Sequence, residues 1–450
     1  MRTPLTPRRT VALVVLLLVS PAVASGVAHH ATTTPAPDRP TAPVDPANLT
    51  VVTTQGTHFH GGGLNPGSGR MAGVRSSNGS VVWTHDEYGW YYDADPVTNR
   101  TLLFVAHDRV DGHYVTFAVE WNWVTGEAER RFRLPGDTHD VDRLGPHRYA
   151  VADKADHRAF VYNYTADDPP RRATDEVRWE FRFREHFPPA PDAGWPDDYT
   201  HLNDVDVIHG GDAFMLSPRN FNRVVAVNRS TKEVIWTLGD QDDTSILDGQ
   251  HHPVVLDEDP LTLLVGDSEN NRVVEYQWVC EAAGTGADVE TGGSDDAATT
   301  ACCPGPDVEG HWERTWAYGR GLNWPRGVQR LPNGNTVIAD TGNDRVVEVT
   351  PNGTVVREYR TAEPHPYDGY RLTHGEGEGP PMARVLGENA SARTGDGRTG
   401  LSTLEYAHRT VGWVLPVWVG ERAFLGLVLA ALLTVGWALT EAGLAVRRRV

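Results

Sequence analysis

Short apolar runs alternate with polar residues through most of the chain, and glycine, asparagine, aspartate and proline separate them. In residues 324–359 the runs are RGVQRL, TVIAD, RVVEVT and VVREY, and Asn333-Gly334 lies in one of the turns. A period of two with many β-branched residues predicts strands, and Asn-Gly favours a hairpin because both residues accept positive φ. The pattern therefore predicts an all-β fold made of short antiparallel strands.

One of these segments recurs along the chain. SPRNFNRVVAV (217–227), GDSENNRVVEY (266–276) and ADTGNDRVVEV (339–349) are near copies, and ADKADHRAFVY (152–162) is a degenerate copy. Units of four strands that repeat in this way are typical of β-propeller blades, which bury their faces only by stacking around an axis. We count six units: 50–88, 90–135, 137–186, 199–240, 249–319 and 322–360. The sequence thus predicts a six-bladed β-propeller over residues 49–361.

An arginine opens the third strand of four of these units. These residues are Arg158, Arg223, Arg272 and Arg345. For Arg158 and Arg345 we expect a structural role, in which the guanidinium bonds carbonyl groups of the preceding turn and holds the hairpin.

The N-terminal residues 1–28 have the layout of a secretory signal. Arg8 and Arg9 precede an apolar run, and the small residues Ala22-Val23-Ala24 follow it. The segment is either cleaved or kept as a membrane anchor, and the arginine pair leaves a twin-arginine export signal open. Residues 29–48 are rich in proline and threonine and are expected to form an extended linker.

The C-terminal part predicts a second linker and a transmembrane helix. Residues 362–410 are rich in glycine and glutamate, residues 411–446 contain a long apolar run, and residues 447–450 are basic. The positive-inside rule places the basic tail in the cytoplasm and the propeller outside the cell. Seven Asn-X-Ser/Thr sequons agree with an extracytoplasmic glycoprotein.

Charge narrows the range of partners. The net charge is −19, and only two of the 41 basic residues, Lys154 and Lys232, are lysines. This composition resembles proteins of halophilic archaea, whose surfaces are rich in carboxylates. No basic stripe is present to displace counterions from phosphates, which argues against nucleic acid as a partner.

Three cysteines flank a polar insertion within residues 280–310. Outside the cell Cys280 is expected to pair with Cys302 or Cys303 and to close this loop. Without such a disulfide, the polar composition predicts a disordered loop. A zinc site is disfavoured because a fourth ligand and the usual spacing are missing.

Histidine is concentrated where the innermost strands of the predicted blades begin. The strand starts contain His85, His139, His201, His251 with His252, and, in the last unit, Trp324-Pro325-Arg326; His58 and His60 lie nearby. Since innermost strands line a propeller's channel, these imidazoles are expected to converge on one mouth. Such a ring of imidazoles can bind a divalent metal. Alternatively, it can bind an anion and supply a nucleophile, while an arginine donates hydrogen bonds to the oxygens of the anion.

Residues 201–276 resemble the arylsulfotransferase family of six-bladed propellers. The matching motifs are His201 with Asn203, Ser217 with Arg219 and Asn222, Trp236 with Leu238 and Gly239, Gln250 with His251 or His252, and Asp267 with Arg272. The last unit also resembles NHL repeats.

The resemblance implies transfer of a sulfuryl group from a phenolic sulfate ester to a phenol through a sulfohistidine, without a cofactor or metal. It implies a catalytic set and a substrate-binding set. The catalytic set is His201, one of His251 and His252, and Arg272, and the substrate-binding set expected around it is Asn203, Arg219, His139 and Arg326.

The last unit departs from the family pattern. The family's nucleophilic histidine belongs to a later strand start, which here reads Asn323-Trp324-Pro325-Arg326; His365 and His374 follow downstream. A non-catalytic, membrane-tethered propeller that binds a ligand or a partner protein at the channel mouth is therefore the alternative function, and a metal-dependent enzyme is the third.

Overall fold

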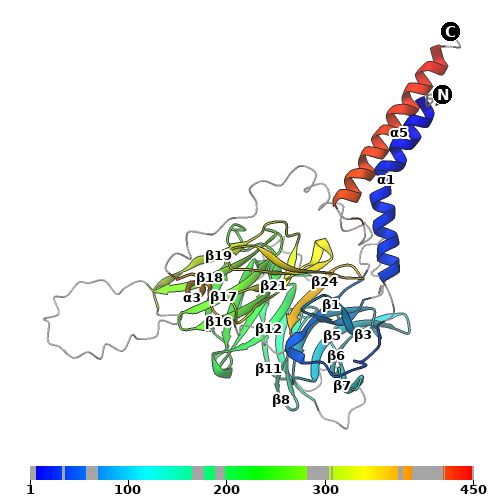
Figure 1. Cartoon of the computed structure of the whole chain (residues 1–450). Coiled ribbons are helices and arrows are strands. Elements are labelled where there is room, and N and C mark those ends of the chain that lie inside the picture. Colours follow the sequence, from blue (N-terminus) through cyan, green and yellow to red (C-terminus); the bar gives the residue numbers. More distant parts are fainter. Residues whose placement is uncertain are drawn as a thin grey trace. The chain divides into compact units, whose positions relative to one another are not determined.

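Six four-stranded antiparallel sheets make up residues 36–399 of the computed structural model and form a propeller (Figure 1). The structure describes residues 7–32, 36–56, 69–164, 177–187, 198–280, 304–305, 308–372, 379–387, 419 and 421–447. Residues 1–35 and 400–450 make up a separate unit. The predicted all-β, six-bladed fold is confirmed.

Each blade runs from an innermost to an outermost strand. Blade 1 is β24 (Pro366–Arg371), β1 (Leu49–Thr54), β2 (Met71–Arg75) and β3 (Val81–His85). Blade 2 is β4 (Trp90–Pro96), β5 (Thr101–Val110), β6 (His113–Asn122) and β7 (Glu127–Leu134). Blade 3 is β8 (Val141–Gly145), β9 (Arg148–Asp153), β10 (Arg158–Asn163) and β11 (Val177–Arg182).

The remaining blades follow the chain in the same way. Blade 4 is β12 (Leu202–Ile208), β13 (Ala213–Pro218), β14 (Arg223–Asn228) and β15 (Val234–Gly239). Blade 5 is β16 (His251–Glu258), β17 (Leu261–Asp267), β18 (Arg272–Cys280) and β19 (Gly310–Tyr318). Blade 6 is β20 (Pro325–Arg330), β21 (Thr336–Asp340), β22 (Arg345–Val349) and β23 (Val355–Arg360).

Blade 1 is completed by both ends of the propeller sequence. β24 pairs antiparallel with β1, with Thr50 opposite Arg371 and Val51 opposite Tyr370. β24 lies inside the segment 362–410 that the sequence analysis treated as a linker, so the propeller extends past residue 361. This pairing closes the ring and leaves no open blade between the ends of the propeller sequence.

Apolar side chains from neighbouring blades pack together between the sheets. Between blades 4 and 5, for example, Met215 and Leu238 share a buried cluster with Leu263 and Val265. Between blades 1 and 2, Trp83 and Trp121 meet edge to face at 5.1 Å. Each such side chain contributes roughly 1.5–3 kcal/mol by burial, which holds the innermost strands around the axis.

Short helices connect or cover the blades. They are η1 (Pro46–Asn48), α2 (Phe183–His186), η3 (His209–Gly211), η4 (Arg219–Phe221), η5 (Thr341–Asn343) and α3 (Met382–Leu386). The backbone N–H of Met382 donates to Glu275 Oε1 at 2.9 Å, and Glu275 also pairs with Arg330 at 3.0 Å, both with fully buried side chains. Helix α3 is thereby tied to the outer part of blade 5.

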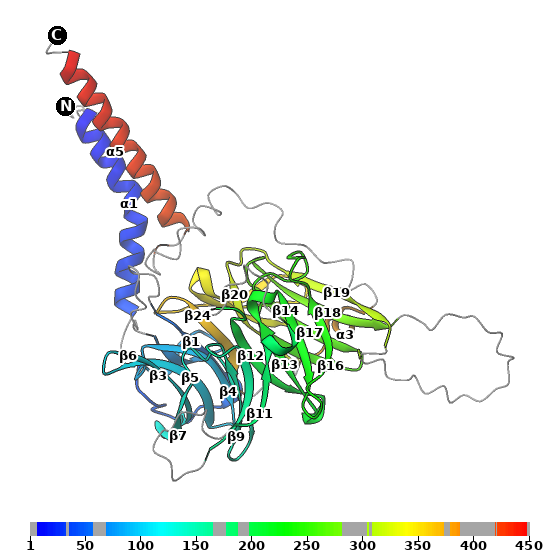
Figure 2. The same cartoon turned by 180° about the vertical axis from the view of Figure 1, so that it is seen from behind.

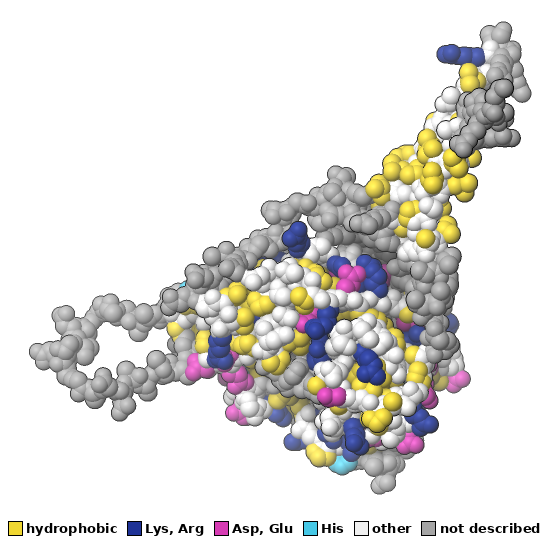
Figure 3. All heavy atoms as spheres, viewed as in Figure 1, with side chains coloured by type: hydrophobic (Ala, Val, Ile, Leu, Met, Phe, Trp, Pro, Cys, Tyr) yellow, Lys and Arg dark blue, Asp and Glu magenta, His cyan; other side chains and the backbone are white. Residues whose placement is uncertain are grey.

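The other unit contains two long helices, α1 (Pro7–Thr32) and α5 (Glu421–Arg447), which pack against each other (Figure 2). Within α5, Ala423–Leu444 is long and apolar enough to cross a membrane, with a mean hydropathy of 2.1. Hydrophobic side chains cover much of the surface of this helix pair (Figure 3). The apolar stretch of α1, Thr10–Gly26, is shorter. Part of the predicted span 411–446, residues 411–418 and 420, lies outside the described residues.

Cys280 is disulfide-bonded, as the sequence analysis expected. Cys302 and Cys303 lie outside the described residues, together with most of the insertion.

Candidate active site

The residues that begin the innermost strands meet near the axis of the propeller. Tyr92 stacks on His139 with ring centroids 4.4 Å apart, and His139 lies 5.4 Å from His201. Tyr367 lies 5.1 Å from Tyr92 and 6.2 Å from His251. We call these residues, with Trp324 and Arg326, the strand-start cluster. The structure thus brings together His139, His201, His251 and Arg326 from the predicted set.

The residues at the beginning of the innermost strands have an unusual backbone conformation. His201, His252, Trp324 and His365 all have positive φ, between 45° and 61°. A register shift follows each start, for example between His251 and Val254 in β16. Left-handed non-glycine residues are strained, and bulges re-aim side chains, so both features are typical of functional positions.

His251 is held as a neutral imidazole with a defined tautomer. Its Nδ1 lies 3.0 Å from the carbonyl oxygen of Gly249 and 2.8 Å from Ser268 Oγ, which itself donates to the carbonyl of Pro325 at 2.6 Å. Because a carbonyl only accepts, Nδ1 carries the proton and Nε2 carries the lone pair. Burial, together with Arg326 and Arg219, holds the pKa of His251 well below its usual value. The result is an imidazole whose Nε2 can act as a nucleophile.

Two arginines flank this histidine and the indole of Trp324. The guanidinium carbons of Arg326 and Arg219 lie 4.0 and 5.9 Å from the indole centroid. Arg326 is 7% exposed and donates to Gln55, and the Nε atoms of both arginines lack a hydrogen-bond partner among the described residues. Burial lowers the pKa of Arg326 to about 10, which leaves it charged at neutral pH. Buried guanidinium donors without partners fit the oxygens of a tetrahedral anion.

The imidazoles of His201 and His139 each contact an aspartate, and Lys154 lies near both aspartates. His201 Nδ1 lies 2.9 Å from Asp198, and His139 Nε2 lies 3.3 Å from Asp137. Lys154 pairs with Asp137 and lies 3.8 Å from Asp198. Burial is the main cause that lowers the pKa of His139, to about 3, and it also lowers the pKa of His201. Both imidazoles are therefore neutral near pH 7.

Sequence reasoning missed Tyr92, Tyr367 and Lys154. A signal for the tyrosines was present, because Tyr92-Asp93 and Tyr367-Asp368 repeat the pattern of His139-Asp140 at other strand starts. The rarity of lysine in this chain was a weaker signal for Lys154.

Arg272 is placed in the outer part of blade 5. Its Nε donates to Asp267 Oδ2 at 2.6 Å, and Nη2 donates to the carbonyls of Ser245 and Ile246 at 2.6 and 3.1 Å. Arg345 bonds Asp340, and Arg158 bonds Asp153, in the same way, at 2.6 and 2.8 Å. Arg272 therefore has the hairpin-holding geometry that the sequence analysis expected for Arg158 and Arg345.

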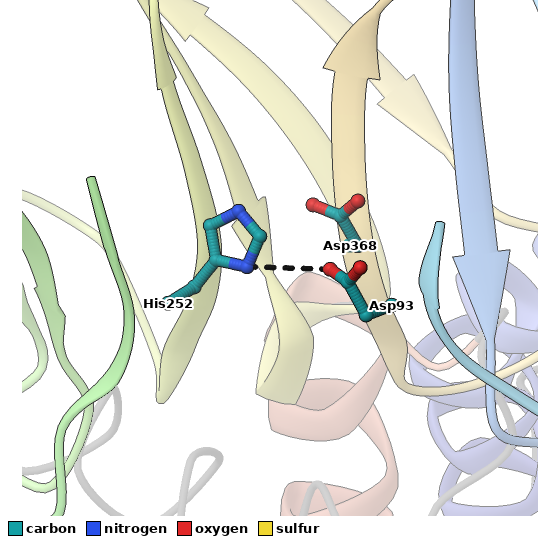
Figure 4. Close-up of side chains that lie close together, drawn as sticks. All are labelled: Asp93, His252 and Asp368. Carbon is teal, nitrogen blue, oxygen red and sulfur yellow. Dashed lines mark ion pairs between the residues drawn. The ribbon is translucent and has the colours of Figure 1, made fainter. Parts of the chain in front are cut away.

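The two adjacent histidines of β16 point to different surroundings. His251 belongs to the strand-start cluster, whereas His252 Nδ1 lies 3.4 Å from Asp93 (Figure 4). The same nitrogen lies 3.7 Å from Asp204. Nearby carboxylates, Asp368 and Asp204 foremost, outweigh burial and raise the pKa of His252. Asn203 is buried and donates to the carbonyl of Gln250 at 3.1 Å.

The predicted ring of histidines is smaller than the sequence suggested. His85 lies in the aromatic core between blades 1 and 2, where it bonds Tyr91 Oη at 2.6 Å and contacts Trp121. His365 is buried and its Nδ1 lies 3.1 Å from the carbonyl of Gly56. His58, His60 and His374 lie outside the described residues.

Comparison with known families and structures gives one family. Residues 74–259 match the family model described as Arylsulfotransferase (ASST), which confirms the resemblance. None of the curated proteins matches the chain.

Similar solved structures include three bacterial proteins of low identity. A candidate 6-phosphogluconolactonase from Bacteroides fragilis is 12% identical with a TM-score of 0.45, and the match covers 73% of this chain and 99% of that one. A protein of unknown function from Bacteroides caccae is 12% identical with a TM-score of 0.43, covering 72% and 98%. The periplasmic gluconolactonase of Pseudomonas aeruginosa is 14% identical with a TM-score of 0.41, covering 72% and 86%.

Proposed function

We propose that this chain, whose residues 74–259 fit the arylsulfotransferase family, transfers a sulfuryl group from a phenolic sulfate ester to a phenol at the strand-start cluster. The observation that carries the proposal is the pairing of His251, with its lone pair on Nε2, with two arginines that have unpartnered donors. A nucleophile beside preorganised positive groups is the arrangement that transfer of an anionic group requires.

In the first half-reaction Nε2 of His251 attacks sulfur. The bond from sulfur to the ester oxygen breaks, its electron pair leaves with the phenolate, and a sulfohistidine forms. Arg326 and Arg219 offset the negative charge on the sulfuryl oxygens. The buried phenols of Tyr92 and Tyr367 belong to the same cluster and supply aromatic faces for the ring of the donor.

In the second half-reaction a phenol oxygen attacks sulfur, and the bond between Nε2 and sulfur breaks. Asp198 accepts a hydrogen bond from Nδ1–H of His201, so Nε2 of His201 carries a lone pair and takes the proton of the attacking phenol. The imidazolium of His201 then releases this proton to solvent, which balances the phenolate lost in the first half-reaction and returns His201 to its neutral form. His251 returns to its neutral tautomer because Gly249 keeps the proton on Nδ1 throughout.

The identity of residue 326 supports a second candidate function, which is binding of an anion without turnover. Arg326 stands at the strand start where the family pattern has its nucleophilic histidine. If His251 does not react, the cluster binds a sulfate ester or a related anion without turning it over. For either function we propose that α5 anchors the chain in a membrane, with Arg447 and the basic tail on the cytoplasmic side.

The test uses the full-length protein in detergent with 4-nitrophenyl sulfate as donor and phenol as acceptor. We expect phenol-dependent release of nitrophenolate, a loss of at least about 10³-fold in His251→Ala, and a sulfuryl group on the peptide that contains His251 after quenching. His113→Ala, at the exposed tip of a blade 2 hairpin, is the matched control and should retain full activity. Binding of the ester without release would favour the second function.

A further inference from the structure

A layer of acidic residues lies one to three residues further along the innermost strands than the strand-start cluster. It consists of Asp93 and Asp95 on β4, Asp140 beside β8, Asp204 on β12, His252 on β16 and Asp368 on β24. We call it the aspartate layer. The mechanism proposed above uses none of these residues.

Ligand atoms in this layer are close enough to share one ion. One atom each from Asp93, His252 and Asp368 lie within 4.8 Å of one another, and so do atoms from Asp93, Asp95 and Asp140. Figure 4 shows the carboxylates of Asp93 and Asp368 side by side, facing the space beside the imidazole of His252. Asp93 belongs to both groups, which together draw their ligands from four blades.

A second observation points into this space. Asp368 is 1% exposed; its Oδ1 accepts the N–H of Gly369 at 2.6 Å, but its Oδ2 has no hydrogen-bond partner among the described residues. Buried carboxylate oxygens are normally paired, because an unpaired charge out of water is costly. In blade 6 the corresponding residue of the innermost strand is Gly327, which has no side chain. A Cβ at this position would lie only 2.3 Å from Asp368 Oδ1, so a larger residue there would clash with this carboxylate.

Charge balance also favours a cation. The layer contains five carboxylates and one imidazole, and all but Asp95 are less than 9% exposed. One imidazolium cannot neutralise four buried carboxylates and a half-buried one, so the remaining charge must be removed by protons or by a bound cation. Arg326, the arginine of the strand-start cluster, donates to Gln55 and lies over the faces of Trp324 and Tyr367, and none of these contacts involves a carboxylate of the layer.

We propose that the aspartate layer binds one divalent cation of the calcium type, with Asp93 as the shared ligand and Asp368, Asp95, Asp140 and His252 around it. Oxygen-rich sites suit Ca²⁺ over softer metals. Ligand atoms within 4.8 Å of one another can share an ion at a Ca²⁺–oxygen distance of roughly 2.4 Å, and Ca²⁺ tolerates irregular sets of ligands whereas Mg²⁺ demands a near-ideal octahedron. The ion cross-links blades 1, 2, 3 and 5 below the strand-start cluster.

The experiment measures Ca²⁺ on the full-length protein in detergent after treatment with EDTA and dialysis. We expect one Ca²⁺ per chain by elemental analysis, and a rise in Tm of roughly 5 °C at 100 times the Kd. Mg²⁺ at the same concentration should give a smaller rise. Asp368→Asn and Asp93→Asn should each weaken Ca²⁺ binding at least tenfold, while Glu127→Gln, an exposed carboxylate at the start of β7, should leave it unchanged.

Two outcomes would overturn the proposal. The first is a wild-type chain that binds no Ca²⁺. The second is a gain of Tm in Asp93→Asn in metal-free buffer together with no response of the wild type to Ca²⁺, because relief of repulsion alone would then explain the layer. Neither outcome bears on sulfuryl transfer, which is measured separately at His251.

Discussion

Arg272 and Asp267 form a buried ion pair at 2.6 Å in blade 5, and Arg345 and Asp340 repeat it at the same distance in blade 6. The two pairs occupy equivalent positions in the repeated sequence. Arg272 therefore belongs to the architecture of a blade, although the family resemblance suggested a place at the sulfuryl site.

The first prediction concerns the stability supplied by this pair. Arg272→Ala should lower the free energy of unfolding by about 3–5 kcal/mol, because it leaves the fully buried Asp267 without its counter-charge. Denaturant unfolding of the full-length chain measures the loss. Arg345→Ala is the matched variant and should lose a similar or smaller amount, since Arg345 is more exposed. A stable Arg272→Ala protein without activity would instead assign Arg272 to catalysis.

A second prediction separates anion binding from chemistry. Arg326→Gln removes a buried cation with an unpartnered Nε, and we expect KM for 4-nitrophenyl sulfate to rise about 10- to 100-fold, as charge-assisted hydrogen bonds contribute roughly 1.5–3 kcal/mol. Steady-state kinetics at several donor concentrations give KM and kcat separately. Arg360→Gln, an exposed arginine on β23, should leave both constants unchanged. Equal KM values for Arg326→Gln and the wild type would remove Arg326 from the site.

The third prediction is a pH dependence of stability that originates in His85. Burial lowers its pKa to about 4, against a weaker opposing effect of Asp86. Since the folded state binds the proton less well than the unfolded state, this contribution is present above pH 6.5 and is lost as pH falls towards 4. The loss amounts to about 3 kcal/mol.

Thermal unfolding between pH 7.5 and 4.5 tests this dependence. His85→Gln keeps a polar group near Tyr91 but does not titrate, so the fall in Tm over this range should be smaller than in the wild type. His147→Gln, at an exposed turn in blade 3, is the control and should follow the wild-type curve. Parallel curves for His85→Gln and the wild type would contradict the assignment.

Local patterns were sufficient to predict the blades. Period-two alternation, Asn-Gly turns and the recurrence of the Arg223, Arg272 and Arg345 segments are properties of neighbouring residues, and they predicted six sheets of four strands. The closure of blade 1 was not predictable in the same way. β24 pairs with β1 across more than three hundred residues, and nothing in the local pattern around Tyr367 selects that partner.

The sequence predicted only part of the candidate site, because it locates the strand starts but not the contacts that form between strands. The sequence identified strand starts rich in histidine, and His139, His201, His251 and Arg326 do meet there. It did not separate His251 from His252, because the bulge that points them to different surroundings arises from pairing with β17.

Residue order alone thus established the repeat, the strand positions, the apolar helix near the C-terminus and the general location of the histidines, since all of these depend on composition and short-range spacing. Ring closure, the tautomer of His251, the structural use of Arg272 and the convergence of five aspartates on the axis depend on the folded molecule. Ring closure and the convergence of the aspartates require groups from different blades, which come together only once the six sheets have closed around a common axis. The tautomer of His251 and the pairing of Arg272 depend on contacts between strands and turns that the folded blade brings together.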